Sequence, residues 1–461
     1  MISTVSSPIW ETRNLREVVT KLVDGSHNPP PKQDTGLPML SARNIDRGQV
    51  LFDDYRLISE SAFVSENART RIAAGDVLLT IVGTIGRTAV VPESSQPFSL
   101  QRSVAVLTPA ANLLPKFLCY QLQSPAIQKH FEANARGTAQ KGVYLKTLGQ
   151  TPIVLPPVDV QTEVVAEIEK QFSRLDEAVA NLKRVKANLK RYKASVLKDA
   201  VEGHLVPTEA ELARREGRSF ETGERLLQRI LEARRKQWNG KGKFKEPAAP
   251  IVDGLPELPE GWAWARLDSV AALKGGITVD SKRADPTASM VPYLRVANVQ
   301  RGYLDMTEIK QISAAAADLA ELRLEFGDIL FNEGGDRDKL GRGWIWENQV
   351  PDCIHQNHVF RARMFLPEMM PKLLSWWGNT FGKDYFQRMG SQTTNLASIN
   401  LSKLSEFPVP IPPAAEQLRL VAEIERLLSV VDRVASEVEA NLKRAQALRG
   451  AVLRRAFSTC T

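Results

Sequence analysis

The chain has 461 residues, of which 43% are hydrophobic and 25% charged, which excludes a single small domain and a wholly disordered polypeptide. Its formal net charge of +8 suits a polyanionic partner such as nucleic acid, since lysine and arginine neutralise phosphates, although many basic proteins never bind nucleic acid. The three cysteines lie far apart and form no CxxC pair, which excludes a disulfide framework and favours a reducing compartment.

The first residues of the chain do not have the pattern of a targeting signal. Residues 1–19 lack the basic and apolar regions of a signal peptide, and no run of about 18 apolar residues occurs anywhere in the sequence. We therefore predict a cytoplasmic protein with no membrane partner.

Residues 1–157 have the pattern of a mixed α/β domain. Short apolar runs predict strands at Val77–Val82, Thr88–Val91 and Val104–Leu107, and Pro115–Phe131 has the spacing of a helix. The pattern leaves the order of the strands in the sheet open.

A long helix is predicted over residues 158–203. It begins after Pro156-Pro157, which cannot lie inside a helix, and neither proline nor glycine occurs again before Gly203. Apolar residues recur every seven positions from Ile168 to Val196, as in the seam of a coiled coil. Such a helix would be about 65 Å long at about 1.5 Å per residue. That length favours pairing with another helix over packing along its own domain, which remains the alternative.

Residues 204–259 form a connector between the two halves of the chain. They begin with a short charged helix near Thr222–Gln237 and continue as a basic, proline-rich stretch. The run Lys241–Lys245 could contact phosphate, but its composition favours a solvated linker. A basic face of the long helix allows the same two interpretations, with a solvated face favoured over a partner or DNA backbone; its residues are Lys183, Arg184, Lys186, Lys190 and Arg191.

The second half of the chain repeats the first. Met290–Ser313 aligns without a gap with Gly36–Ser59, and Pro412-Pro413 stands 256 positions after Pro156-Pro157. Residues 260–412 therefore predict a second α/β domain, with a helix at Pro371–Met389, and residues 413–458 predict a second long helix. The expected fold class is α+β: two similar α/β domains separated by two long antiparallel helices that form a coiled-coil spacer, as a pseudo-twofold internal repeat.

Three motifs connect the chain to a known family. PIVLPP and PVPIPP precede the two long helices, and GLPELPEGW follows the basic connector. With these motifs the sequence resembles, over essentially its whole length, the specificity subunit of Type I restriction-modification systems (the HsdS family). One departure is Val160, which stands where the second half has Glu416 before the shared glutamine, and which could alter a cap or a partner contact.

The resemblance implies a mechanism for the whole chain. Each α/β domain would be a target recognition domain that reads one half of a split double-stranded DNA target, and the helices would set the unread gap. Two methylation subunits and the translocation and cleavage subunits would dock on the chain. The chemistry would belong to those partners, which use S-adenosylmethionine for adenine N6 methylation and ATP with Mg²⁺ for translocation and cleavage. The chain itself would bind no cofactor and no metal.

Candidate DNA contacts are polar side chains in glycine-containing loops, because glycine lets the backbone approach DNA and polar groups reach base edges or phosphates. Ordinary turns between strands are the competing interpretation. In the first half the candidates are Ser26, His27, Asn28, Thr84, Arg87, Gln101, Arg102, Thr138, Gln140 and Lys141. In the second half they are Arg337, Arg342, Gln356, Asn357, Ser391, Gln392, Thr393, Thr394 and Asn395.

Motifs for catalysis and metal binding are incomplete in this sequence. His27-Asn28-Pro29-Pro30 is similar to the Asn-Pro-Pro-aromatic loop of adenine methyltransferases, but the next residue is Pro31, which cannot stack on a flipped base. No GxxxxGK[ST] loop occurs. His355 and His358 near Cys353 would suit zinc only with a further pair of ligands, which the sequence does not offer. We predict no catalytic residues.

Two other functions remain open as alternatives. A stand-alone DNA methyltransferase or nuclease would need a cofactor loop or metal-binding carboxylates. A coiled-coil scaffold that binds only protein would show no sequence-dependent affinity for DNA, so binding to random-sequence duplexes separates it from a specificity subunit.

Overall fold

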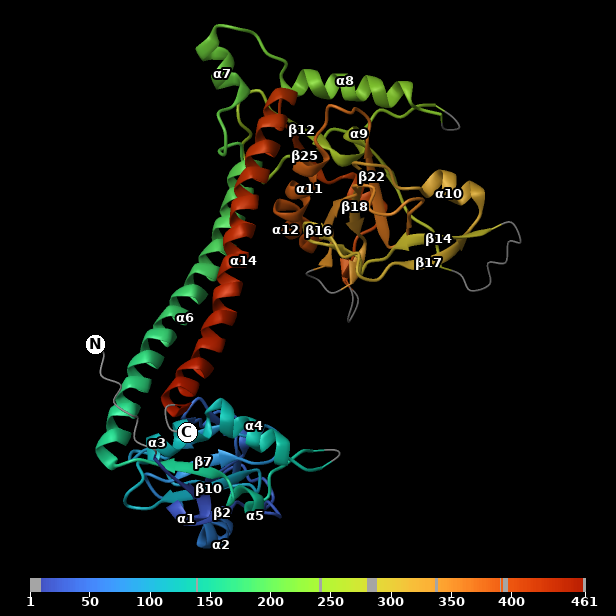
Figure 1. Cartoon of the computed structure of the whole chain (residues 1–461). Coiled ribbons are helices and arrows are strands. Elements are labelled where there is room, and N and C mark those ends of the chain that lie inside the picture. The colour runs from blue at the N-terminus through green and yellow to red at the C-terminus, as the bar shows by residue number, and fades with distance from the viewer. Residues whose placement is uncertain are drawn as a thin grey trace. The chain divides into compact units, whose positions relative to one another are not determined.

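The computed structural model describes residues 10–137, 140–239, 243–279, 288–335, 339–389, 391–392 and 397–458. The chain divides into two compact units, one formed by Met1–Val185 with Glu437–Thr461 and the other by Lys186–Ser436. We name them unit 1 and unit 2. Each unit contains one α/β domain and a segment of both long helices (Figure 1).

The first domain is built on a four-stranded antiparallel sheet. Its strand order is β2 (Val19–Asp24), β10 (Val104–Pro109), β7 (Val77–Thr80) and β8 (Thr88–Val90). A second sheet has the order β6 (Arg56–Ile58), β3 (Leu37–Leu40) and β9 (Ser99–Leu100). Its remaining elements are β1 (Glu11–Asn14), α1 (Leu15–Val18), the 3-10 helix η1 (Ala42–Asn44), β4 (Ile45–Asp46), β5 (Gln49–Val50), α2 (Glu60–Thr70), α3 (Pro115–Leu122), α4 (Pro125–Asn134), α5 (Leu145–Leu148) and β11 (Pro152–Leu155).

Strand β7 is buried along its whole length, and its first three residues are apolar because both of its faces are covered. Val77 and Leu79 point into one core with Phe117 of α3, whereas Leu78 points into another core with Leu40 of the second sheet. Successive side chains of a strand alternate between its faces, so a continuous apolar run marks a strand buried on both sides. This explains why the apolar runs of the sequence located the strands.

The second domain repeats the strand order of the first. Its four-stranded sheet has the order β13 (Ala271–Lys274), β22 (Val359–Met364), β18 (Ile329–Asn332) and β20 (Gly343–Ile345). Leu37 pairs with Ile58 in the first domain, and Val291 pairs with Ile312 at the equivalent place in the second. The predicted duplication is confirmed at the level of strand register.

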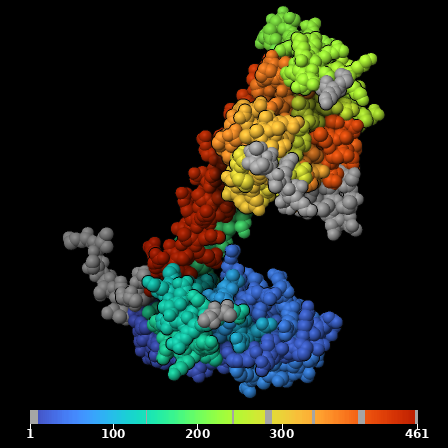
Figure 2. Space-filling view, turned by 90° about the vertical axis from the view of Figure 1, so that its right-hand side faces the viewer, coloured from blue at the N-terminus to red at the C-terminus, as the bar shows by residue number. Residues whose placement is uncertain are grey.

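The second domain and the connector hold these further elements. The domain contains β12 (Ala263–Arg266), α9 (Leu267–Val270), β14 (Ser289–Leu294), β15 (Val299–Gln300), β16 (Tyr303–Leu304), β17 (Lys310–Ala314), α10 (Ala316–Leu322), β19 (Gly334–Gly335), β21 (Ile354–His355), α11 (Pro371–Asn379), α12 (Phe381–Met389), β23 (Ser391–Gln392), β24 (Ala397–Ser398), α13 (Leu401–Ser405) and β25 (Pro408–Ile411). The connector contains α7 (Glu209–Glu216) and α8 (Gly223–Lys236). Figure 2 shows this yellow-green part of the chain against the second domain, where α8 packs on β12 and α9.

Three predicted elements need correction. The helix expected at Pro115–Phe131 is two helices, because Pro125 cannot donate a hydrogen bond and Ser124 caps a new helix by accepting from the Ile127 amide. The helix expected at Pro371–Met389 also divides, at Thr380, where the backbone leaves the helical region. The strand expected at Val77–Val82 ends at Thr80.

The long helices are α6 (Val158–Val201) and α14 (Ala414–Ser458), and they pack antiparallel within each unit. In unit 1, Ile168 and Phe172 of α6 bury against Leu453 of α14. In unit 2, Ala200 of α6 buries against Leu420. The second helix repeats the seven-residue spacing of the first. Ile424, Val431, Val438 and Ala445 of this seam are buried, whereas Val452 is half-buried.

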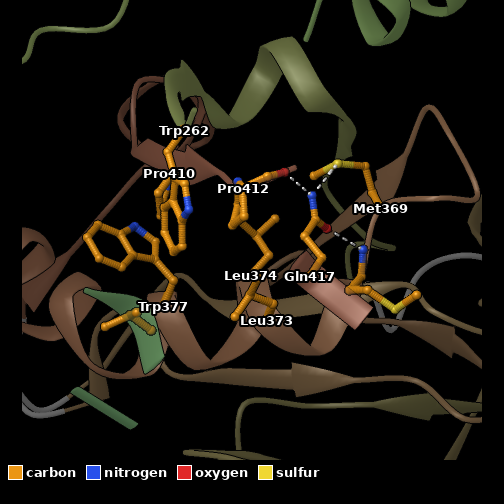
Figure 3. Close-up of a pocket in the computed structure, with 10 residues that line it drawn as sticks. Trp262, Met369, Leu373, Leu374, Trp377, Pro410, Pro412 and Gln417 are labelled. Atoms are coloured by element: carbon orange, nitrogen blue, oxygen red, sulfur yellow. Dashed lines mark hydrogen bonds between the residues drawn. The ribbon is translucent and has the colours of Figure 1, made fainter. Parts of the chain in front are cut away.

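A glutamine fixes the start of each long helix to its domain. In unit 2 the Gln417 side chain accepts from the Met370 amide at 3.0 Å and donates to the Pro412 carbonyl at 2.9 Å (Figure 3). In unit 1 Gln161 accepts from the Leu114 amide at 2.8 Å and donates to the Pro156 carbonyl at 2.8 Å. The cavity beside Gln417, of about 10 Å³, is a packing gap too small for a ligand.

The helix start in unit 2 has an additional anchor. Glu416 is fully buried and accepts from the Glu209 amide at 2.7 Å and from the Trp262 indole at 2.9 Å. Burial raises the pKa of Glu416. In unit 2 this carboxylate ties α7 to the start of α14. Val160 stands at the equivalent position of unit 1, so unit 1 lacks such an anchor.

No helix in the described part of the chain combines the length and apolarity needed to cross a membrane.

Candidate nucleic-acid interface

The predicted DNA-contacting loops of the first domain gather at one end of β7. The Ile81 amide donates to the Ser103 carbonyl at 2.9 Å, and the Ile81 carbonyl accepts from the Val143 amide at 2.8 Å. Gly83 donates to the Lys141 carbonyl at 3.1 Å. The turn after β9, the loop after β7 and the loop before α5 therefore lie side by side.

The turn after β2 joins the same group of loops. The Ser26 amide donates to the Leu100 carbonyl at 2.7 Å, and the Arg102 amide donates to the Ser26 carbonyl at 2.8 Å. A Cβ on Gly25 would lie 2.2 Å from the Leu100 carbonyl oxygen, so only glycine fits there. The structure thus brings Ser26 next to Gln101 and Arg102, as one group of polar side chains.

The His27 imidazole is held in place by a carboxylate. Its Nε2 lies 2.8 Å from Asp24 Oδ2, and Asp24 also pairs with Arg69. The side chain of His27 is 57% exposed, so it remains accessible to a ligand. Asn28, next in the chain, is exposed as well.

Arg87 follows a tight turn at the end of β7. The Gly86 amide donates to the Thr80 carbonyl at 2.9 Å, and the Arg87 amide donates to the Thr80 hydroxyl at 2.9 Å. The Arg87 Nε lies 3.7 Å from an oxygen of Asp46 in the β4–β5 hairpin. Sequence reasoning did not single out Asp46, although the tight turn at the following Arg47-Gly48 was part of the detected repeat.

The second domain presents equivalent backbone positions with different side chains. The Ile277 amide donates to the His355 carbonyl at 2.8 Å, and the Asn357 amide donates to the Ile277 carbonyl at 2.9 Å. This is the hydrogen-bond pattern of Ser26 with Leu100 and Arg102. Gln356 and Asn357 are therefore the counterparts of Gln101 and Arg102.

Arg342 is the backbone counterpart of Arg87. The Asn332 amide donates to the Arg342 carbonyl at 3.0 Å, as the Thr80 amide donates to that of Arg87 at 2.8 Å. Gln300 stands where the first domain has Asp46, by the equivalent pairing of the small hairpins. Within the described residues the Arg342 Nε is buried without a hydrogen-bond partner.

An acidic and basic pair marks the same edge of the second domain. His358 Nδ1 lies 2.5 Å from Glu333 Oε2, and the His358 side chain is 54% exposed. The Glu333 amide donates to the His358 carbonyl, as that of Ile81 does to Ser103. Glu333 is not among the contacts predicted from the sequence. An ionised carboxylate at this edge can accept from a cytosine amino group.

The remaining predicted contacts divide into three groups. Thr84, Gln140 and Lys141 are exposed on the loops around β7. Ser391 and Gln392 form β23, which pairs with β24. Five predicted residues lie outside the described part of the chain: Thr138, Arg337, Thr393, Thr394 and Asn395.

The two histidines weighed as zinc ligands serve other purposes. His355 is fully buried, its Nδ1 donates to the Val359 carbonyl at 2.6 Å, and burial lowers its pKa to about 4. Burial also raises the pKa of the Cys353 thiol to about 12, which disfavours the thiolate that binds metal. Among the described residues no three His, Cys, Asp or Glu side chains lie close enough together to hold a metal ion.

Comparison with known proteins gives one matching family. Residues 9–191 match the family model described as the Type I restriction modification DNA specificity domain. The Type I restriction enzyme EcoKI specificity subunit of Escherichia coli K12 is 20% identical over 435 residues, covering 92% of this chain and 82% of that protein. The EcoBI specificity subunit of Escherichia coli is 28% identical over 171 residues, 37% of this chain and 36% of that protein.

Solved structures share the fold over the whole chain. The HsdS subunit from Thermoanaerobacter tengcongensis has a TM-score of 0.53 and 19% identity, with 98% of both chains covered. A chain from a study of complex assembly and conformational transition of the type I R-M system has a TM-score of 0.60 and 21% identity, also with 98% of both chains covered.

Proposed function

The chain belongs to the family of Type I restriction-modification specificity subunits, and we propose that it reads a split, asymmetric DNA target, one half-site for each α/β domain. The observation that carries this proposal is the shared backbone of the two loop clusters. Equivalent hydrogen bonds place Arg102 and Asn357 alike, yet one side chain is a cation and the other an amide. Similar frames with different reading groups suit two different half-sites.

The two long helices would set the length of the unread gap. Each of them continues from one unit into the other without a break in helical structure, α6 over 44 residues and α14 over 45. Each unit contains buried seam residues, Ile168 and Val438 in unit 1 and Val196 and Val431 in unit 2, which supports pairing of the helices on both sides of the boundary. A spacer of constant length keeps two half-sites at a constant number of base pairs.

The chain would direct chemistry that other subunits perform. We assign it no catalytic residue and no cofactor of its own, because its relatives are specificity subunits. Methylation subunits, two in our proposal, would methylate adenine N6 with S-adenosylmethionine. Restriction subunits would use ATP and Mg²⁺ to translocate and cleave DNA. The complex would act in the cytoplasm.

Single-molecule methylome sequencing of the source cell tests this function directly. The expected result is a methyl-adenine motif in two unlike blocks separated by a fixed number of unread base pairs, which disappears when the gene is deleted. A continuous motif, or an unchanged methylome after deletion, would contradict the proposal.

In vitro selection with the purified full-length chain addresses the two alternatives. A specificity subunit enriches a split sequence from random duplexes at a stated salt concentration, whereas a scaffold protein enriches none. Transfer of a labelled methyl group by the chain alone would instead indicate a stand-alone methyltransferase.

A further inference from the structure

The middle of α6 is strongly basic. Between residues 178 and 198 the helix has seven lysines and arginines and no acidic residue. Two of these have a carboxylate nearby in unit 2: Lys193 lies 3.5 Å from Asp432, and Lys198 lies 4.0 Å from Glu202. Lys183, Arg184, Lys190 and Arg191 have no carboxylate partner among the described residues, and these four are the subject of the inference.

A five-residue motif explains how the arginines keep their charge. ANLKR occurs at residues 180–184, 187–191 and 440–444. In each copy the arginine donates to the asparagine three positions earlier; the pairs are Arg184 with Asn181, Arg191 with Asn188, and Arg444 with Asn441. A neutral amide orients a guanidinium but leaves its charge in place. By contrast, Arg426 on the same pair of helices lies 2.8 Å from the Glu423 carboxylate.

The lysines of the two α6 copies are also available. Lys183 and Lys190 are exposed, and neither side chain makes a hydrogen bond or an ion pair within the described residues. They follow the seam residues Leu182 and Leu189 by one position, so they lie on one flank of the seam. The other flank is apolar.

The apolar flank shows that the two sides of the helix pair differ in chemistry. Val185 and Tyr192 follow the same seam residues by three positions and are 40% and 48% exposed. Each lies two positions after a lysine, and at about 100° per residue this places it on nearly the opposite side of the helix. A helix of a partner protein would bury apolar side chains and so would match this flank, whereas the lysine flank suits a polyanion.

In unit 2, the lysine flank of α6 borders a groove next to the second domain. Lys190 lines this groove of about 1320 Å³, whose other wall belongs to that domain. The second domain contributes Arg301, Lys372 and Lys383 to the groove, together with Trp344 and Trp376. The acidic residues that line it are Glu202, Asp384, Glu425 and Asp432. The uncompensated charge of α6 therefore lies next to the domain that would hold a half-site.

We propose that Lys183, Arg184, Lys190 and Arg191 form a sequence-independent binding surface for the phosphates of the unread base pairs between the half-sites. This inference rests on the proposed function, because it assigns the gap DNA to the helices that set its length. Lysine and arginine bound to phosphate raise affinity without reading sequence. The gap would be held by the protein as well as spanned by it.

The test uses the full-length chain with all four residues changed: Lys183→Gln, Arg184→Gln, Lys190→Gln and Arg191→Gln. Glutamine keeps the helix, since its helix propensity is close to that of lysine. The slope of log affinity against log salt should become shallower by about 0.9 for each phosphate that the variant no longer neutralises, while the selected half-sites stay the same. The matched control removes four charges elsewhere on the same helices: Lys170→Gln, Arg174→Gln, Arg426→Gln and Arg454→Gln. This control should leave the salt slope unchanged.

If the fourfold variant fails to fold, the two ANLKR pairs are changed separately.

Chemically neutral DNA makes the test independent of the variants. Methylphosphonate linkages placed only in the gap should weaken binding by the unmodified chain and have little effect on the fourfold variant. The proposal is overturned if gap neutralisation does not weaken wild-type binding, or if the variant keeps the wild-type salt slope. It is also overturned if the variant loses a co-purified subunit while its DNA binding is unchanged, because the charges then face protein. Absence of any sequence selection by the wild-type chain would instead refute the proposed function.

Discussion

Single side chains at equivalent backbone positions decide what the two domains can read. Arg87 lies 3.7 Å from Asp46, so part of its charge is already compensated in the free protein. Arg342 has Gln300 in place of that aspartate, and its Nε is buried without a partner among the described residues. No ion pair with Arg342 occurs among the described residues, so its guanidinium charge is available for a guanine edge or a phosphate.

We expect Arg342→Ala to relax one base position in one half-site and leave the other half-site intact. Removal of a bidentate hydrogen-bonded pair with guanine costs about 1–3 kcal/mol. In vitro selection with the variant measures this. Arg342→Lys keeps the charge but not the forked donor geometry, so it should relax the base as Arg342→Ala does. If Arg342→Lys restores wild-type selection, Arg342 contacts phosphate rather than a base.

His355 should make the stability of unit 2 depend on pH. Burial lowers its folded pKa from 6.5 to about 4, so below pH 6.5 the unfolded chain binds a proton that the folded chain refuses. Stability should therefore fall as the pH drops from 6.5 towards 4, by about 3 kcal/mol in total. The variant His355→Leu, which copies Leu100 of the first domain, should lack this part of the decline.

Urea unfolding at pH 7.5 and pH 5, followed by tryptophan fluorescence, measures the effect of His355. The signal reports mainly unit 2, because seven of the eight tryptophans lie after residue 186. Between these two pH values the wild type should lose about 2 kcal/mol more than His355→Leu. Equal losses in both proteins would show that His355 titrates normally.

Sequence alone located these loops but could not align them residue by residue. Leu40 and Leu294 are 254 positions apart, whereas Pro156 and Pro412 are 256 apart. The loop between Glu333 and Arg342 is longer than its counterpart between Ile81 and Arg87, so spacing could not separate Arg337 from Arg342 as the equivalent of Arg87. The backbone hydrogen bonds of β18 make that assignment, since they do not depend on loop length.

The connector helix α7 is held by buried charge at the start of α14. Glu209 pairs with Arg218 and Arg419, each at 2.6 Å, and its amide donates to Glu416. Burial acts to raise the pKa of Glu209, but the hydrogen bonds from both arginines bring it below its ordinary value. The sequence did not predict α7, because its short charged segment shows no apolar repeat. The position of α7 depends on a hydrogen bond to Glu416, which lies 207 positions further along the chain.

Glu416→Val, which copies Val160, should release α7 from unit 2. The change leaves the Glu209 amide and the Trp262 indole without acceptors, at a cost of about 1–3 kcal/mol for each buried donor. Hydrogen exchange of residues 209–216 should become faster, while that of the first domain stays the same. Glu416→Gln keeps one acceptor and should have an intermediate effect. Unchanged exchange in α7 would show that other contacts hold it.

The long helices provide the sharpest test at the level of whole elements. The seam could be predicted from the heptad pattern, because the apolar repeat does not depend on which charged residues occupy the outer faces of the helices. Inserting one heptad into each helix, after Val185 and after Glu439, adds about 10 Å, or about three base pairs. The unread gap should lengthen while both half-sites stay the same.

The rotation of the DNA makes the number of inserted heptads informative. Three heptads add about 32 Å, close to one turn of the duplex, and should restore affinity better than one heptad does. Inserting four residues instead shifts the seam and should destabilise the pairing. A change in either half-site sequence after whole-heptad insertion would contradict the role of the helices as a spacer.

At the scale of the molecule, the repeat is incomplete in one respect. Strand β12 alternates buried and partly buried residues because α8 covers it, whereas the equivalent β1 is exposed at every position. The duplication was visible in the sequence, but this asymmetry was not, since it depends on where the connector folds. A graft between the domains must therefore leave β12 and β25 in place.

Replacing residues 271–407 by a second copy of residues 19–151 meets that condition. The boundaries are equivalent, because Leu15 donates to the Thr151 carbonyl as Leu267 donates to that of Phe407. Trp262 and Glu416 also stay in the chain. With two identical reading domains on antiparallel helices, the target should become an inverted repeat of the half-site that the first domain reads. Methylome sequencing of cells that carry the graft would show this motif.

Adding Arg87→Ala to the grafted copy alone should relax one base in a single half-site, which assigns that half-site to its domain. Retention of the original second half-site would mean that residues outside 271–407 read it.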